Sequence, residues 1–171
     1  MLTRLAQGIS SRRRRLVGCL LFALTLALTA CAPPLTPADI EQYGTRTYSG
    51  TSRTQVFRGA VAALRSLGYE TAVVDEGAGR IKSTPKLLVV HASGSQYGAR
   101  ATGSSLAWDI DVTAGGAGGA AVSARPRGYE GGQSIPISRM NGEYMKRTYE
   151  TLFTEIESNL PAGARKVDGA R

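Results

Sequence analysis

Residues 106–113 read Leu-Ala-Trp-Asp-Ile-Asp-Val-Thr, and large apolar side chains alternate in this stretch with small or polar ones. Because successive side chains of a strand point to opposite faces, the alternation predicts a strand with one buried face. The face that we expect to be buried carries Leu106, Trp108, Ile110 and Val112. The other face carries Ala107, Asp109, Asp111 and Thr113. This stretch therefore predicts a sheet whose Trp108 face lies against the hydrophobic core.

A glycine-rich segment, residues 115–119, follows this strand, and alternation then resumes from Ala120 to Ala124. This pattern predicts an antiparallel hairpin. If Gly115 faces Gly119 across the turn, Val112 lies opposite Val122 and Asp109 lies opposite Arg125. Both apolar faces then coincide, which favours this register over one that is shifted by a residue.

Two other segments carry apolar residues at the spacing of a helix. The first begins after Ser52, which forms a capping-box signature with Gln55, and Gly68 stands where a C′ glycine ends a helix. The second ends before Pro161. The first stripe consists of Val56, Phe57, Ala60, Val61, Leu64 and Leu67. The second consists of Met145, Tyr149, Leu152, Phe153, Ile156 and Leu160.

The remaining segments complete the predicted order of elements. Residues 69–75 and 80–84 have strand composition and are joined by a turn, and Leu87 to Ala92 extends this hairpin beyond a break at Pro85. We expect residues 127–140 to form an irregular loop. The fold prediction is α+β: a two-layer sandwich in which two helices cover one face of an antiparallel sheet of about four strands, in the order α-β-β-β-β-α.

The first thirty residues have the pattern of a secretory signal peptide. Five arginines precede an almost wholly apolar run from Leu16 to Ala30. Leu28-Thr29-Ala30-Cys31 resembles the lipobox of bacterial lipoproteins, in which the cysteine is diacylated and becomes the first residue. Cys19 also ends a similar tetrapeptide. The residues directly before that tetrapeptide are arginines, so no apolar core of a signal peptide would remain. We therefore predict lipidation of Cys31.

Removal of this segment changes the charge of the chain. The formal charge is +8, but residues 1–30 hold five of the 21 basic residues and no acid, which leaves 16 bases against 13 acids, or about +3. That is an ordinary surface charge, and an exported protein does not meet nucleic acid. We predict no nucleic-acid partner. The residue after the cysteine is Ala32. An aspartate at this position resembles an inner-membrane retention signal, so its absence favours a location on the outer membrane, facing the periplasm.

The predicted domain organisation has four parts. A signal peptide (1–30) is followed by the lipidated cysteine and a proline-rich, extended tether (31–45), a single α+β domain (46–160) and a disordered tail (161–171). Arg46-Thr47-Tyr48 before the first helix and Leu64-x-x-Leu67-Gly68-Tyr69 at its end resemble small envelope lipoproteins. Their domains are similar to the helix-grip domains of the BamC family. The resemblance implies a binding or scaffold domain and carries over no functional residue.

No residue pattern predicts an active site, a cofactor or a metal. Asp109 and Asp111 share one strand face at about 6.5–7 Å, near the separation in inverting glycosidases, but they are better explained as solvated outer-face residues or by an Asp109–Arg125 pair. His91 is the only histidine, and we expect it at a strand end. The segment 115–119 lacks the Lys-Ser/Thr pair of a phosphate-binding loop.

The sequence leaves three functions open. The leading hypothesis is a non-enzymatic, lipid-anchored accessory or scaffold protein that contacts an envelope protein through a sheet edge or the segment 127–140. The second is a binding module for an anionic glycan or lipid. Its candidate contacts are Arg125, Arg127, Tyr129 and Arg139. The third is a hydrolase that uses Asp109 and Asp111. The oligomeric state and the identity of the partner are not predicted.

Overall fold

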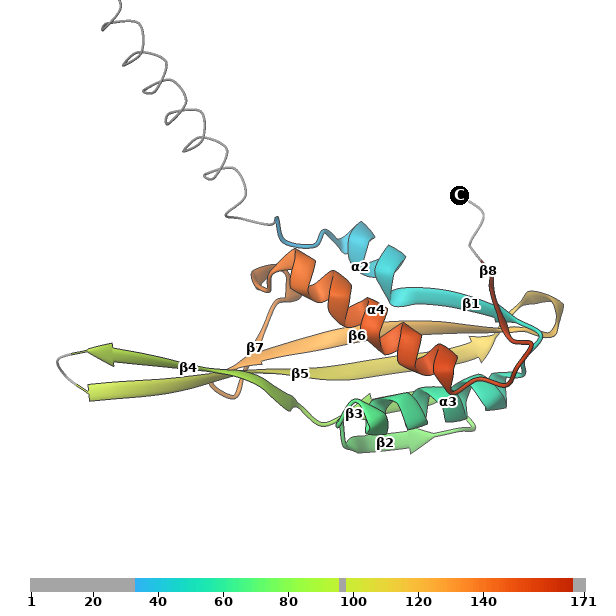
Figure 1. The fold of residues 1–171 in the computed structure, drawn as a ribbon, viewed down its shortest axis with the longest axis horizontal. Helices are drawn as coiled ribbons and strands as arrows, with labels where there is room; N and C mark the ends of the chain where they lie inside the picture. Colours follow the sequence, from blue (N-terminus) through green and yellow to red (C-terminus); the bar gives the residue numbers. More distant parts are fainter. Residues whose placement is uncertain (1–32, 96–97, 168–171) are drawn as a thin grey trace, which may run out of the picture. The chain divides into compact units, whose positions relative to one another are not determined.

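The computed structural model describes residues 33–95 and 98–167. Within them it contains an antiparallel sheet and three α-helices (Figure 1). The α-helices are α2 (Pro37–Gly44), α3 (Arg53–Ser66) and α4 (Gly142–Ser158), and the short 3₁₀ helices are η1 (Gly116–Gly118) and η2 (Ile137–Arg139). The strands are β1 (Thr45–Ser49), β2 (Thr71–Asp75), β3 (Arg80–Ser83), β4 (Lys86–Ser95), β5 (Gly98–Ala114), β6 (Ala120–Glu130), β7 (Gln133–Ile135) and β8 (Arg165–Val167).

The eight described strands form one sheet around β5. The main path runs β2-β3-β5-β6-β1-β8, while β4 pairs with β5 and β7 pairs with β6 beside this path. On one side, β5 pairs with β6. On the other side it pairs with β4 over its first half and with β3 over residues 109–111. Pro85 lies between β3 and β4, at the break that its missing N–H predicts.

The predicted hairpin is confirmed. In the β5–β6 ladder, Val112 pairs with Val122 and Asp109 pairs with Arg125. The Gly115 N–H donates to the Gly119 carbonyl at 2.8 Å, so the glycine-rich segment is the turn between two strands. The capping box at the start of α3 and the positive φ (75°) of Gly68 after its end are also as predicted.

Helices α3 and α4 lie side by side on one face of the sheet and bury it (Figure 1). The buried face of β5 is the predicted one, and Trp108 is only 1 % exposed. The Trp108 ring meets that of Tyr149 from α4 edge to face, with the ring centroids 5.4 Å apart. Burial of these large rings beneath the helices contributes to the stability of the core.

The predicted sheet of about four strands with two helices is wrong. The described residues contain eight strands and three α-helices. Strands β1, β7 and β8 have three to five residues each, too few to show a periodic pattern. The far part of the β4–β5 hairpin is rich in glycine, alanine and serine and shows no apolar alternation. Segment 127–140, predicted as a loop, contains the end of β6, then β7 and η2.

The structure also differs from the prediction at both ends of the domain. Residues 37–44, part of the predicted extended tether, form α2, with Pro37 in its first turn and a capping box between Thr36 and Asp39. Leu35 before it is 4 % exposed and joins the core. Within the predicted tail, β8 pairs with β1. The predicted signal peptide and Cys31 lie outside the described residues, and no described helix is long and apolar enough to span a membrane.

Candidate functional site

The structure separates the four predicted contact residues into two groups. Arg125, Arg127 and Tyr129 alternate along β6 with buried residues and lie on the sheet face opposite the helices. Arg139 belongs to η2 and lines a cavity together with Met140. These residues therefore do not form one basic patch.

Each arginine on β6 has a carboxylate partner on β5. Arg125 donates a short hydrogen bond to Asp111, which also pairs with Arg80 at 3.7 Å. Arg127 pairs with Asp109 at 3.1 Å. The expected Asp109–Arg125 ion pair is wrong: these residues are opposite in register, but each arginine reaches a carboxylate on the diagonal. The two aspartates are thus engaged as structural partners.

Arg127 is the more enclosed of the two arginines. Its guanidinium also donates to the Tyr129 hydroxyl at 2.8 Å and to the Ser83 carbonyl at 3.3 Å. Its Nε and the Asp109 Oδ1 are both inaccessible to solvent, and each is the other's ionic partner. The Arg125 side chain, by contrast, is 64 % exposed.

Replacement of Arg127 by alanine is expected to lower the free energy of unfolding by about 1–3 kcal/mol, because it leaves a buried carboxylate oxygen without its partner. The matched change Arg125→Ala removes an exposed ion pair and is expected to cost less than about 1 kcal/mol. Urea unfolding of both variants measures the difference. Equal losses would contradict the assignment of Arg127 as the structural arginine.

The structure also places the other residues that the sequence analysis considered. His91 lies inside β4, opposite Thr102, and not at a strand end as expected, because β4 continues through the small residues that follow it. The segment 115–119 is a hairpin turn. No group of three or more potential metal ligands occurs in the part of the chain that the structure describes.

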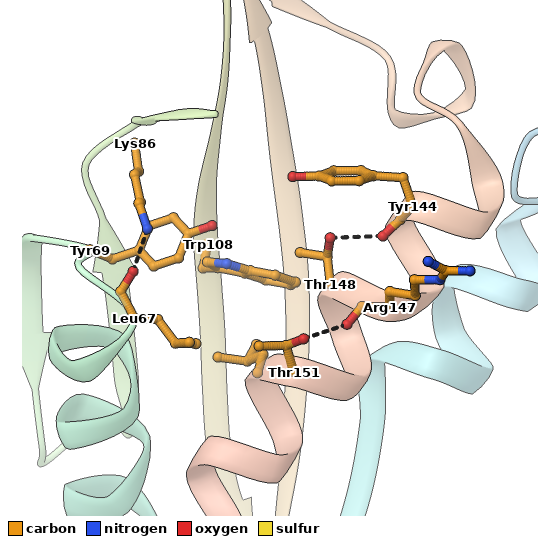
Figure 2. Close-up of a pocket in the computed structure, with 9 residues that line it drawn as sticks. Leu67, Tyr69, Lys86, Trp108, Tyr144, Arg147, Thr148 and Thr151 are labelled. Atoms are coloured by element: carbon orange, nitrogen blue, oxygen red, sulfur yellow. Dashed lines mark hydrogen bonds between the residues drawn. The ribbon is translucent and has the colours of Figure 1, made fainter. Parts of the chain in front are cut away.

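A cavity of about 310 Å³ lies where the end of α3 approaches α4. Figure 2 shows Trp108 in its middle, with Tyr69 and Lys86 on one side and Tyr144 on the other. Leu67 and Leu152 add apolar walls. The Arg147 side chain points away from this cavity, toward Glu143, with which it pairs at 3.4 Å. The lining residues include no aspartate or glutamate.

Hydrogen-bond donors gather on the Tyr69 side of this cavity. The Lys86 ammonium donates to the Leu67 carbonyl at 2.6 Å and lies 5.3 Å from the centre of the Tyr69 ring. The Trp108 Nε1–H is buried and has no hydrogen-bond partner among the described residues. Burial raises the pKa of the Tyr69 phenol, and the nearby Trp108 indole opposes part of this rise without reaching normal hydrogen-bond geometry. The phenol is therefore a neutral donor near pH 7.

Tyr144, in the first turns of α4, separates this cavity from a second one of about 290 Å³ and lines both. The second cavity lies between β4 and the start of α4. Its walls are Leu88, Val89, Ser104, Glu130, Ile135, Arg139, Met140, Asn141 and Tyr144. The two cavities line the β4 side of α4.

β4 contributes Lys86 to the lining of the first cavity and Leu88 and Val89 to that of the second. Among the described residues β4 pairs only with β5, so the backbone groups along its other edge have no strand partner. Leu87 and Val89 are 57 % and 47 % exposed beside this edge. An unpaired strand edge with apolar side chains is a template on which another strand can add.

No protein-family model and no curated protein sequence matches this chain. The site must therefore be assessed from its own geometry.

From the sequence, Tyr69, Lys86 and Tyr144 have no predicted role in a site. Tyr69 appears only in a predicted strand and in the motif that resembles envelope lipoproteins. The sequence offers one indication of the site. Tyr69 and Tyr144 are aromatic and lie at the ends of the two helical stripes, where a groove between helix and sheet opens. Bringing Lys86 against Tyr69 requires the chain reversal through β2 and β3, which periodicity does not show.

Proposed function

We propose that this protein is a lipid-anchored, non-enzymatic envelope protein that binds an extended segment of a partner protein along the free edge of β4. The anchor is the predicted lipid on Cys31, and Ala32 after it favours the outer membrane, facing the periplasm. Two acyl chains give stable anchoring where one gives only marginal binding. The lipid fixes where the domain works, and the edge of β4 is the surface through which it works.

The long edge of β4 that has no strand partner among the described residues is the observation that carries this proposal. Soluble proteins protect their edge strands by short length, by charge, by proline or by bulges. β4 has ten residues, and the stretch 87–95 contains no lysine, arginine, acidic residue or proline. Its pairing with β5 is regular from Val89 to Ser95, after a bulge between Leu87 and Val89.

The other edges of the sheet are better protected. β8 has three residues, of which Arg165 and Lys166 are cationic. β2 has five residues with an irregularity between Thr71 and Val73, and ends at Asp75. β4 is therefore the edge that best suits an added strand. Alternate side chains of that strand would face the cavities beside Tyr144.

The ion pairs on the opposite sheet face weigh against the two other functions. Arg125 and Arg127 are neutralised by Asp111 and Asp109, which leaves less free positive charge for an anionic glycan or lipid. The same pairs occupy both carboxylates that a hydrolase would need. Neither aspartate lines either cavity described above.

Site-specific photo-crosslinking in cells tests the proposal. With the crosslinking amino acid at Val89, we expect one discrete crosslinked envelope protein, and with the same amino acid at Val73 on β2, similarly exposed at 41 %, we expect none. Leu87→Lys should abolish the Val89 crosslink because a lysine beside the edge disfavours an added strand.

Val74→Lys on β2 is the matched control and should leave the Val89 crosslink intact. Crosslinks of equal yield from both strands, or a Val89 crosslink that survives Leu87→Lys, would refute strand addition at β4. Absence of any crosslink at Val89 would refute it as well.

A further inference from the structure

We infer that the cavity over Trp108 binds a small carboxylate that carries an apolar tail. This inference goes beyond the proposed function, because it concerns a small ligand of the groove and not a partner strand at the β4 edge. The argument rests on the shape of the cavity, on its donors and on its lack of acidic residues.

The first step is the size and lining of the cavity. Its volume of about 310 Å³ falls in the range of natural ligand pockets, which are mostly apolar with a few polar groups that fix the ligand. Leu67, Leu152 and the rings of Tyr69 and Tyr144 provide apolar walls (Figure 2). These walls suit an alkyl or aryl group.

The second step is the unpartnered donor in the wall. A buried indole N–H without a hydrogen bond carries a desolvation cost of about 1–3 kcal/mol. Trp108 is 1 % exposed, its Nε1 is closed to solvent, and the Tyr69 hydroxyl approaches it without reaching normal hydrogen-bond geometry. In Figure 2 the nitrogen edge of the indole faces the side of the cavity where Tyr69 stands. A ligand oxygen supplies a better acceptor once the Tyr69 side chain shifts, because in this structure the nitrogen is closed to solvent.

The third step is the charge around that donor. The Lys86 ammonium has three N–H donors and uses one for the Leu67 carbonyl. Tyr69 adds a neutral hydroxyl, and the hydroxyls of Thr148 and Thr151 donate to carbonyls of their own helix. The lining thus supplies several donors, has Lys86 as the cation beside Tyr69 and contains no carboxylate. This combination selects an anionic acceptor over a cationic or purely apolar ligand.

Trp108 provides a direct readout, because it is the only tryptophan of the chain and gives a single indole N–H signal. The full-length lipidated chain, held in phospholipid nanodiscs, is titrated with octanoate, octanol and octylamine while the indole ¹H–¹⁵N cross-peak is followed. Octanoate is expected to shift this peak downfield in a saturable manner. Octanol should bind at least tenfold more weakly, and octylamine should leave the peak in place.

Variants identify the donors. Lys86→Met is expected to weaken octanoate binding about tenfold or more, and Lys86→Arg should restore most of it. Lys82→Met is the matched control, since Lys82 lies on β3 and outside the cavity lining, and it should bind octanoate as the unmodified chain does. Tyr69→Phe keeps the ring, removes one donor and should weaken binding even if Lys86→Met fails to fold.

Three results would overturn the inference. They are an indole peak that does not move with octanoate, an equal response to octylamine, and octanoate binding that neither Lys86→Met nor Tyr69→Phe weakens. A shift that grows in proportion to the octanoate concentration without saturating would indicate partition of octanoate into the lipid and would overturn it equally.

Discussion

Cys31→Ser is expected to abolish lipid attachment completely. The thiol is the group that accepts the diacylglyceryl chain in proteins with such a lipobox, and a serine hydroxyl does not replace it. A signal peptide with a lipobox is cleaved only after its cysteine is acylated. The variant should therefore also keep the mass of the uncleaved precursor. Metabolic labelling with radioactive palmitate and mass spectrometry of the product measure both effects.

Cys19→Ser is the matched control. Cys19 follows a similar tetrapeptide but has no apolar core before it, so this variant should incorporate palmitate as the unmodified chain does. The reverse pattern, with labelling lost in Cys19→Ser and kept in Cys31→Ser, would contradict the predicted cleavage site. It would also move the start of the tether by twelve residues, from 31 back to 19.

Trp108→Ala is expected to cause the largest loss of stability, about 3–5 kcal/mol. The side chain is fully buried, contacts Tyr149 edge to face and stands on the strand that pairs with β3, β4 and β6. Its removal leaves a large void beneath both helices that the sheet cannot close. For a domain of this size, the melting temperature should fall by roughly 10–20 °C.

Trp108→Phe separates packing from the indole nitrogen. Phenylalanine keeps an aromatic contact with Tyr149 and removes the buried N–H that has no partner, so its loss should be less than half that of the alanine variant. Thermal unfolding followed by circular dichroism measures both. An alanine variant as stable as the phenylalanine variant would mean that the aromatic side chain of Trp108 does not stabilise the core.

The parts of the fold that the sequence predicted are those that depend on contacts close along the chain. Ser52 and Gln55 are three residues apart, and their capping box forms as expected. The β5–β6 register follows from a short turn and from the need of Val112 and Val122 to share one face. The partners in these features are close along the chain, so residue spacing is enough to specify one arrangement.

Some of the parts that were wrong depend on partners far away in the sequence, and others are local. β1 and β8 pair with each other across more than a hundred residues, and neither strand has enough residues to show alternation. Three prolines suggested an extended tether, but Pro37 is tolerated in the first turn of α2 because that turn needs no N–H donor from it. Local composition alone does not distinguish these cases.

The sequence by itself therefore determined the helical stripes, the Trp108 face, the β5–β6 register and the prediction that Cys31 carries a lipid. Each of these follows from residues that are neighbours in the chain or repeat with a fixed period. Only the tertiary structure decided that Lys86 and Tyr69 meet beside Trp108, that Arg127 is enclosed while Arg125 is exposed, and that β4 keeps a free edge. Those features arise from strand order and helix packing, which a one-dimensional pattern does not encode.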